Sequence, residues 1–265
     1  MKIYISVDME GITGVTHWNE TILGHSEHQW AKDQMTKETI AACEAAIEMG
    51  AKEIFVKDAH SSGRNIDITK LPIQANVIRG WTGSPESMMA GIDSSYDACI
   101  FIGYHSPSRC NGNPLSHTMN PEKPVYVKIN GEISSEFTMN AYIAAYYNVP
   151  VIFLSGDEVI CNQSKDLISN IEIVSVKKCD GDATFNIHPE YACECIKNGV
   201  KEGMKKIQQC KIQSPKEFEM EIRFQKHQDA KRASYYPGVT VIDDYTVKYK
   251  AKDIQDMMTA RMFIL

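Results

Sequence analysis

Two carboxylates, Asp8 and Glu10, directly follow the stretch "KIYISV" near the start of the 265-residue chain. The β-branched, aromatic and apolar residues of this stretch predict a buried strand, on which side chains two positions apart point to the same face. Two like charges held so close repel each other unless a cation, an arginine or helix N–H groups lie between them. The pair therefore predicts a site for a positive group. Gly11 and Gly14 come next, and they predict a turn whose backbone can approach another group closely.

Histidines follow two further apolar stretches. His60 comes just after "EIFVKD" (53–58), and His105 comes just after "DACIFIG" (97–103). The carboxyl ends of parallel strands meet at one sheet edge, where such folds bind ligands. A donor set of Asp, Glu and His without cysteine suits zinc, manganese or iron, and its excess of oxygen atoms allows two ions that share a carboxylate.

Each of these residues alone has a plainer interpretation. A strand-end aspartate often caps the next helix, and a single histidine is more often hydrogen-bonded than metal-bound. The recurrence of acidic or imidazole groups after three predicted strands is what favours a metal site.

The elements that must position these residues alternate along the chain. Short apolar stretches separated by longer segments of helical period are typical of a parallel sheet covered by helices. The expected fold class is therefore α/β with three layers: a mostly parallel sheet flanked by helices. Two more strands are expected at 149–156 and 171–177. Helices are expected over 134–147, over 189–208, and between an N-capping Ser26 and Gly50.

The pattern changes after residue 213, where shorter and more polar alternations such as "EFEMEIRF" and "YTVKYK" predict antiparallel strands. We therefore expect a metal-binding α/β catalytic domain over 1–212. Residues 213–265 are expected to form a smaller α+β C-terminal domain or a sheet extension, with the boundary near Pro215.

Composition excludes several classes of protein. The chain is 43% hydrophobic and 23% charged, as in ordinary globular proteins, and its net charge of -6 gives no electrostatic reason to expect nucleic acid or an anionic membrane as a partner. The start lacks the apolar core of a secretory signal and no segment approaches eighteen apolar residues, so a cytoplasmic location is expected. The eight cysteines are scattered without a CxxC pair, which predicts reduced thiols.

Five motifs occur in one order along the chain: "SVDMEGITG" (6–14), "DAH" (58–60), "GYH" (103–105), "SHTM" (116–119) and "E-x-x-x-NAY" (136–142). Together they resemble the zinc-dependent D-aminopeptidase family, from residue 1 to about 160, and the tail at 247–257 is similar in character. The resemblance implies a metallopeptidase that releases N-terminal, D-configured residues from short peptides or amino-acid amides. It also implies two zinc ions per subunit and a ring-like homo-oligomer.

The resemblance also implies site residues. The implied zinc ligands are Asp8, Glu10, His60, His105 and Glu136, with Asp8 bridging both ions. The strand-end argument selects the first four independently. Glu136 comes from the resemblance, because a glutamate in the first turn of a helix usually serves the helix dipole, and Glu132 is a rival by proximity.

The family's catalytic histidine corresponds to His117. Two bridged cations would activate a water molecule and polarise a carbonyl, which is the chemistry of amide hydrolysis. The five ligands would be occupied, so a separate group must move protons to the leaving amine, and a histidine with an ordinary pKa of about 6.5 suits that task. A nucleophilic role for His117 remains open.

Two other functions remain as alternatives. One is a dimetal hydrolase of another class, a phosphoesterase or an amidase, although the motifs contain no arginine or lysine for a phosphate. The other is a non-catalytic metal-binding protein, although structural zinc sites are usually closed by cysteine and histidine. Residues 16–30 and 106–114 follow no pattern of the family, and they are the expected walls of the substrate pocket.

Overall fold

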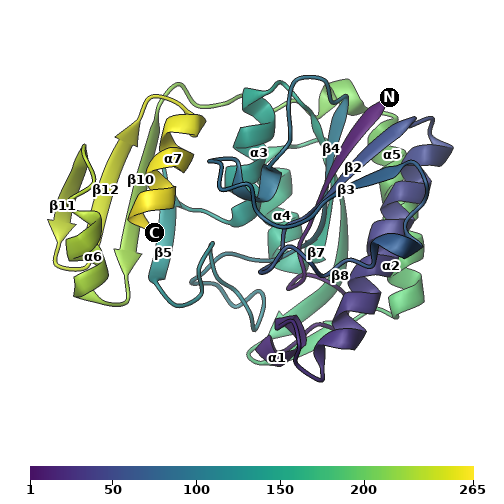
Figure 1. The fold of residues 1–265 in the computed structure, drawn as a ribbon, viewed down its shortest axis with the longest axis horizontal. Coiled ribbons are helices and arrows are strands. Elements are labelled where there is room, and N and C mark those ends of the chain that lie inside the picture. Colours follow the sequence, from purple (N-terminus) through teal and green to yellow (C-terminus); the bar gives the residue numbers. More distant parts are fainter.

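The computed structural model describes residues 1–265 and contains two separate sheets. A seven-stranded, mostly parallel sheet is flanked by helices, and a five-stranded antiparallel sheet lies beside it (Figure 1). The three-layer α/β fold predicted from the sequence is confirmed. The longest helices are too short or too polar to cross a membrane.

The seven-stranded sheet has the order β3-β2-β1-β4-β7-β8-β9. Its strands are β1 (Lys2–Val7), β2 (Glu53–Asp58), β3 (Ala75–Ile78), β4 (Ala98–Tyr104), β7 (Val151–Asp157), β8 (Glu172–Asp180) and β9 (Ala183–Asn186). All neighbours are parallel except β8 and β9. The central strands β4 and β7 are buried along their whole length, because helices cover both faces of the sheet. The five strands expected from the apolar stretches are confirmed, whereas the short strands β3 and β9 were not predicted.

Helices lie on both faces of this sheet. Figure 1 shows α2 (His28–Glu48) and α5 (Pro189–Met204) together on one side, and α3 (Glu136–Tyr146) and α4 (Glu158–Leu167) on the other. The three expected helices are confirmed as α2, α3 and α5. The predicted cap of α2 is wrong: the N-cap is Glu27, not Ser26, and it makes no side-chain capping bond. The amide of His28 instead bonds the carbonyl of His25, so a turn of backbone leads into the helix.

The start of α3 is fixed by aromatic packing. The ring of Phe137 packs edge-on against Phe101 of β4 at 5.2 Å, and Phe101 packs in the same way against Tyr104 at 4.8 Å. Such edge-to-face contacts have a preferred geometry, so they set how α3 meets β4. As a result Glu136, the first residue of α3, lies beside the end of β4.

The antiparallel sheet has the order β11-β12-β10-β5-β6. Its strands are β5 (Pro124–Ile129), β6 (Glu132–Ile133), β10 (Phe218–Phe224), β11 (Val239–Asp243) and β12 (Thr246–Ala251). The antiparallel strands expected after residue 213 are confirmed. The sheet also takes two strands from the middle of the chain, so it joins residues on both sides of the predicted domain boundary.

Three further helices complete the fold. They are α1 (Trp18–Thr21), α6 (His227–Ala233) and α7 (Ile254–Ile264), with single 3-10 turns at Ile68–Lys70, Ser87–Met89 and Ile207–Gln209. Helix α7 lies against the antiparallel sheet and faces α3 (Figure 1).

Candidate metal centre

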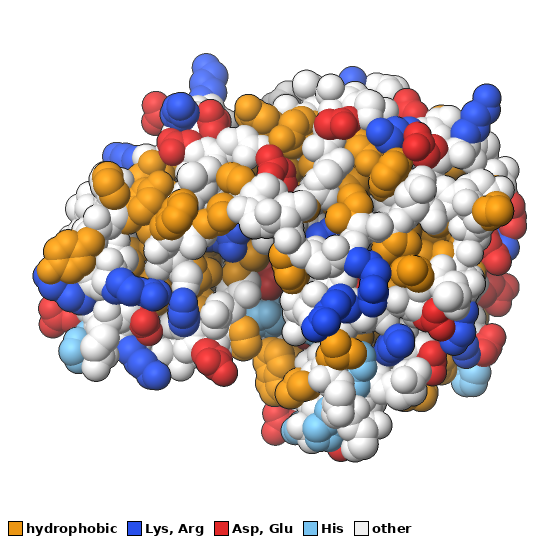
Figure 2. Space-filling model, viewed as in Figure 1, with side chains coloured by type: hydrophobic (Ala, Val, Ile, Leu, Met, Phe, Trp, Pro, Cys, Tyr) orange, Lys and Arg blue, Asp and Glu red, His pale blue; other side chains and the backbone are white.

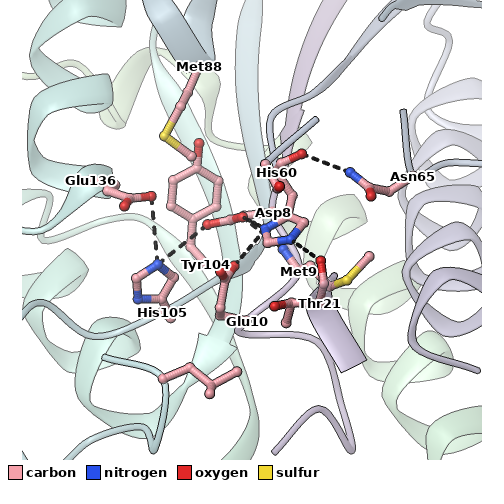
Figure 3. A network of polar contacts seen from close by, with 12 residues as sticks. Asp8, Met9, Glu10, Thr21, His60, Asn65, Met88, Tyr104, His105 and Glu136 are labelled. Atoms are coloured by element: carbon pink, nitrogen blue, oxygen red, sulfur yellow. Dashed lines mark hydrogen bonds and ion pairs between the residues drawn. The ribbon is translucent and has the colours of Figure 1, made fainter. Parts of the chain in front are cut away.

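The carboxyl ends of three neighbouring strands bring acidic and imidazole side chains together, as Figure 3 shows. Val7 at the end of β1 is paired with Asp58 of β2 and with Ile102 of β4, so the residues that follow these strands lie at one level. Asp8 and Glu10 follow β1, His60 follows β2 and His105 follows β4. Glu136 joins them from α3. Each of these five residues is at most 5% exposed, so water screens their charges little.

The potential ligand atoms form two groups, each with its atoms within 4.8 Å of one another. The groups are Asp8, Glu10 and His60, and His105, His117 and Glu136. Asp8 lies between them: its Oδ1 is 3.2 Å from His60 Nδ1, and its Oδ2 is 3.6 Å from His105 Nε2. One carboxylate therefore presents an oxygen to each group. Within the groups, Glu10 Oε2 is 3.0 Å from His60 Nδ1, and Glu136 Oε2 is 3.6 Å from His105 Nε2.

The histidine rings are oriented by the backbone. In each of them the ring nitrogen that faces away from the cluster lies 2.9 Å from a carbonyl oxygen. The pairs are His60 Nε2 with Thr21, His105 Nδ1 with Ser106, and His117 Nδ1 with Leu115. A carbonyl only accepts hydrogen bonds, so these nitrogens carry a proton and the other ring nitrogen faces the cluster, where its lone pair can bind a cation once the ring is neutral. Metal-binding histidines are typically held in this way.

Several buried atoms of the cluster have no hydrogen-bond partner: Asp8 Oδ2, Glu10 Oε2 and His105 Nε2. A buried polar atom without a partner is costly and rare in a folded protein. All three can donate an electron pair: Glu10 Oε2 lies in the group with His60, and Asp8 Oδ2 faces His105 Nε2 at 3.6 Å. The donor set therefore fits cations.

Without a cation, the pKa values of Asp8, His60 and His105 are raised, so these groups hold protons, whereas neighbouring histidines lower the pKa values of Glu10 and Glu136 against the effect of burial. Burial, and then the neighbouring Glu10, raise the pKa of Asp8 to about 8. Burial is the largest single effect on His105 and opposes its charged form, but Glu136, Glu10 and Asp8 together outweigh burial and raise the pKa of that ring to about 10. Protons thus take the place of positive charge, and a metal ion that binds here must release them.

His117 is packed between two rings. It stacks on His105 with ring centres 4.4 Å apart and 15° between the planes, and it meets Trp18 edge-on with ring centres 5.4 Å apart. Its Nε2 is 3.4 Å from Glu136 Oε1. Burial, and then the neighbouring His105, lower the pKa of His117, which favours a neutral ring. This position suits His117 both for proton transfer and for binding a cation together with His105 and Glu136.

A pocket of about 320 Å³ opens onto the cluster. Its apolar lining consists of Trp18, Ile22, Ala59, Trp81, Met88, Met119 and Pro121. Figure 2 shows apolar and histidine side chains around the notch between the two parts of the molecule. Of the two expected walls, residues 16–30 contribute Trp18, Thr21 and Ile22, whereas residues 106–114 do not line the pocket. Segment 106–114 instead contacts the backbone that carries the donors, because Asn113 Nδ2 donates to the carbonyl of Glu10 at 3.0 Å.

Trp81 was missed by the sequence analysis. Its side chain is 44% exposed at the pocket, yet it is held in place. The indole Nε1 donates to the carbonyl of Ser61 at 2.7 Å, and the ammonium of Lys57 lies 4.2 Å from the ring centre. Nothing in the surrounding "RGWTGSP" has the period of a helix or a strand, so the sequence offered no signal that this ring reaches the site.

The motif residues that are not donors support the site. Asp58 accepts hydrogen bonds from the backbone amides of Asn65 and Ile66, and Asn65 Nδ2 donates to the carbonyl of His60 at 2.8 Å. Asn140 donates to the hydroxyl of Tyr104 at 2.9 Å, which ties α3 to the end of β4. The rival Glu132 is exposed on β6 and does not line this pocket.

Comparisons with known proteins cover the whole chain. Residues 1–263 match the family described as D-aminopeptidase. A D-aminopeptidase of Bacillus subtilis (strain 168) is 29% identical over 265 residues, which are 99% of this chain and 96% of the relative. A solved structure, the Zn-dependent D-aminopeptidase DppA from Bacillus subtilis, described as a self-compartmentalizing protease, matches with a TM-score of 0.93. It is 28% identical and the match covers 100% of this chain and 96% of that one. Both sheets and every residue of the cluster lie within these matches.

Proposed function

The chain belongs to the D-aminopeptidase family and is a zinc metallopeptidase, and we propose that it releases N-terminal D-amino acids from short peptides or amino-acid amides with two zinc ions per subunit. The observation that carries the two-ion proposal is the position of Asp8. Its two carboxylate oxygens face different donor groups, and Oδ2 is buried without a hydrogen-bond partner.

We assign the ligands by group. Glu10 and His60 would hold one ion, His105 and Glu136 would hold the other, and Asp8 would contact both. The three carboxylates favour the high positive charge that two zinc ions bring. The carbonyl-bound tautomers of His60 and His105 support the assignment, because they leave Nδ1 and Nε2 respectively free to bind.

Bound zinc would supply Lewis acidity, which acidifies a water molecule and polarises a carbonyl oxygen. The chain supplies the movement of protons. The lone pair of His117 Nε2 faces the cluster while Nδ1 donates to Leu115, so the ring can take up a proton at Nε2 and give it to the leaving amine. The ring of Trp18 packs edge-on against His117 and adds to its fixed orientation.

We also propose a ring-like homo-oligomer in the cytoplasm. The description of the structural neighbour as self-compartmentalizing supports the assembly, and eight unpaired cysteines support a reducing compartment. Sedimentation of active protein as a 29.8 kDa monomer would contradict the ring.

The test of function combines metal analysis with a substrate screen. Purified protein should contain about two zinc ions per chain, and it should hydrolyse D-aminoacyl amides and D-configured dipeptides faster than the L-forms. Turnover restricted to L-substrates would exclude the D-preference and leave the metal site intact. Glu136→Gln should lose activity, whereas the matched change Glu132→Gln, on the exposed strand β6, should be nearly silent.

A further inference from the structure

A buried lysine that the proposed reaction does not use lies behind the metal centre. Lys177, near the end of β8, is 1% exposed and forms no ion pair within 4.0 Å. A buried ammonium is costly unless its hydrogen bonds are satisfied. Two of its three donors are used: Nζ donates to the carbonyl of Glu10 at 2.5 Å and to the carbonyl of Val15 at 2.6 Å.

These two carbonyls are the ends of one loop. Residues 10–15 leave β1 and cross the edge of the sheet without regular secondary structure beyond turns. A single ammonium therefore closes the loop by binding its first and its last carbonyl. Other groups also hold the loop: Asn113 donates to the carbonyl of Glu10, Glu38 accepts from the amide of Thr13, and the carbonyl of Gly103 accepts from the amide of Gly11.

We propose that Lys177 is a positioning residue for zinc. By holding the carbonyl of Glu10, it fixes the backbone from which the Glu10 side chain reaches to within 3.0 Å of His60 Nδ1. The effect concerns the group of Asp8, Glu10 and His60, because the ammonium bonds no residue of the other group. This inference rests on the two donor groups of the proposed function, but it concerns zinc affinity and not the choice of substrate.

The sign of the effect separates positioning from simple electrostatics. The ammonium of Lys177 is positive and so is zinc, so the two charges repel each other. If charge alone mattered, a neutral residue at this position would strengthen zinc binding. If Lys177 holds the loop, the same change weakens zinc binding, because Glu10 loses its fixed position.

The experiment compares zinc affinities of the wild type and Lys177→Met by competition with a chelator. We expect one of the two zinc equivalents to weaken by about 10- to 100-fold, the range for loss of an outer group that orients a ligand, and the other to stay unchanged. Ile222→Ala, in the buried face of β10, is the control: it should lower Tm without changing either affinity. If Lys177→Met does not fold, Lys177→Gln keeps one neutral donor and should show the same pattern to a smaller degree.

Several results for Lys177→Met would contradict a positioning role. Equal weakening of both equivalents, unchanged affinities or tighter zinc binding in Lys177→Met would each overturn it. If the wild type binds a single zinc, the two-ion proposal fails, and the role of Lys177 is then judged by whether that one affinity falls. A crystal structure of the variant should show residues 10–15 displaced and Glu10 away from His60; an unmoved loop would also overturn the inference. A wild type that cleaves no D-aminoacyl amide would refute the proposed function while leaving the zinc comparison valid.

Discussion

Gly11→Ala is a small change that should disable the metal centre. Gly11 directly follows Glu10, and a Cβ atom placed on it would lie 1.8 Å from the carbonyl oxygen of Tyr104 and 2.5 Å from its carbonyl carbon. Tyr104 cannot retreat, because Gly156 of β7 approaches the same oxygen from its own side, where a Cβ would lie at 2.0 Å. The obstacle is backbone and not the end of a flexible side chain, so the loop itself must move.

The size of the effect follows from this distance. The gap has to open from 1.8 Å to at least 3.0 Å, a displacement of more than 1 Å. Glu10 lies next to one side of the gap and His105 next to the other, so donors of both groups are pulled apart. A misplacement of about 1 Å in a catalytic site costs about a hundredfold in rate, and overpacking costs about 1–3 kcal/mol of stability.

The assay measures kcat/KM on a D-aminoacyl amide together with zinc content and Tm. Gly203→Ala is the control. Gly203 lies on α5, away from the site, and a Cβ placed on it would lie 2.6 Å from the carbonyl oxygen of Ile152. It should lose a similar amount of stability while keeping zinc and activity. A folded Gly11→Ala protein with full zinc and wild-type kcat/KM would show that the close approach of Gly11 to Tyr104 does not position the donors.

Three further predictions concern single residues. Asp8→Ala should lose more zinc than His60→Ala by elemental analysis, because Asp8 faces both groups; full zinc in Asp8→Ala would disprove the bridge. His117→Ala should keep its zinc while turnover falls by about a hundredfold or more, with a smaller loss on a nitroanilide than on a dipeptide; loss of zinc would make it a ligand. Burial raises the pKa of Glu38 from 4.5 to about 7, so the folded state binds this proton more tightly than the unfolded chain. Stability should therefore fall by about 3 kcal/mol as pH rises from below 4.5 to above 7, and urea unfolding of Glu38→Gln should lack this fall.

The part of the site that lies after strands could be predicted from the sequence. Asp8, His60 and His105 each follow an apolar stretch, and parallel strands necessarily deliver such residues to one edge. The structure brings them together, as expected. Lys177 stands at the same edge, but the end of "IEIVSVK" looks like a solvated strand end, and only the fold shows that its ammonium turns inward to the carbonyl of Glu10.

The parts that the local sequence pattern does not encode depend on contacts between distant segments, and Glu136 was predicted only through the family resemblance. Glu136 reaches the cluster because Phe137 packs on Phe101, a contact that no local period encodes. Strand β5 begins with a proline and pairs with β10, about ninety residues further along the chain. The local sequence around β5 therefore does not indicate its partner strand. Ser26 has the residue type of a helix cap. The backbone turn at 25–28 precedes the helix instead, so the N-cap position falls on Glu27.

The pairing of β5 with β10 also orders events during synthesis of the chain. All six residues of the cluster lie within the first 136 positions, so a growing chain carries them early. The segment from His117 to Glu136 runs through β5, whose long partner β10 begins only at Phe218. Until β10 has been synthesised, β5 can pair only with the two-residue β6. The loop that carries His117 is then not supported by the complete antiparallel sheet. Synthesis of the donors and completion of the sheet that supports the segment from His117 to Glu136 are therefore separated in time.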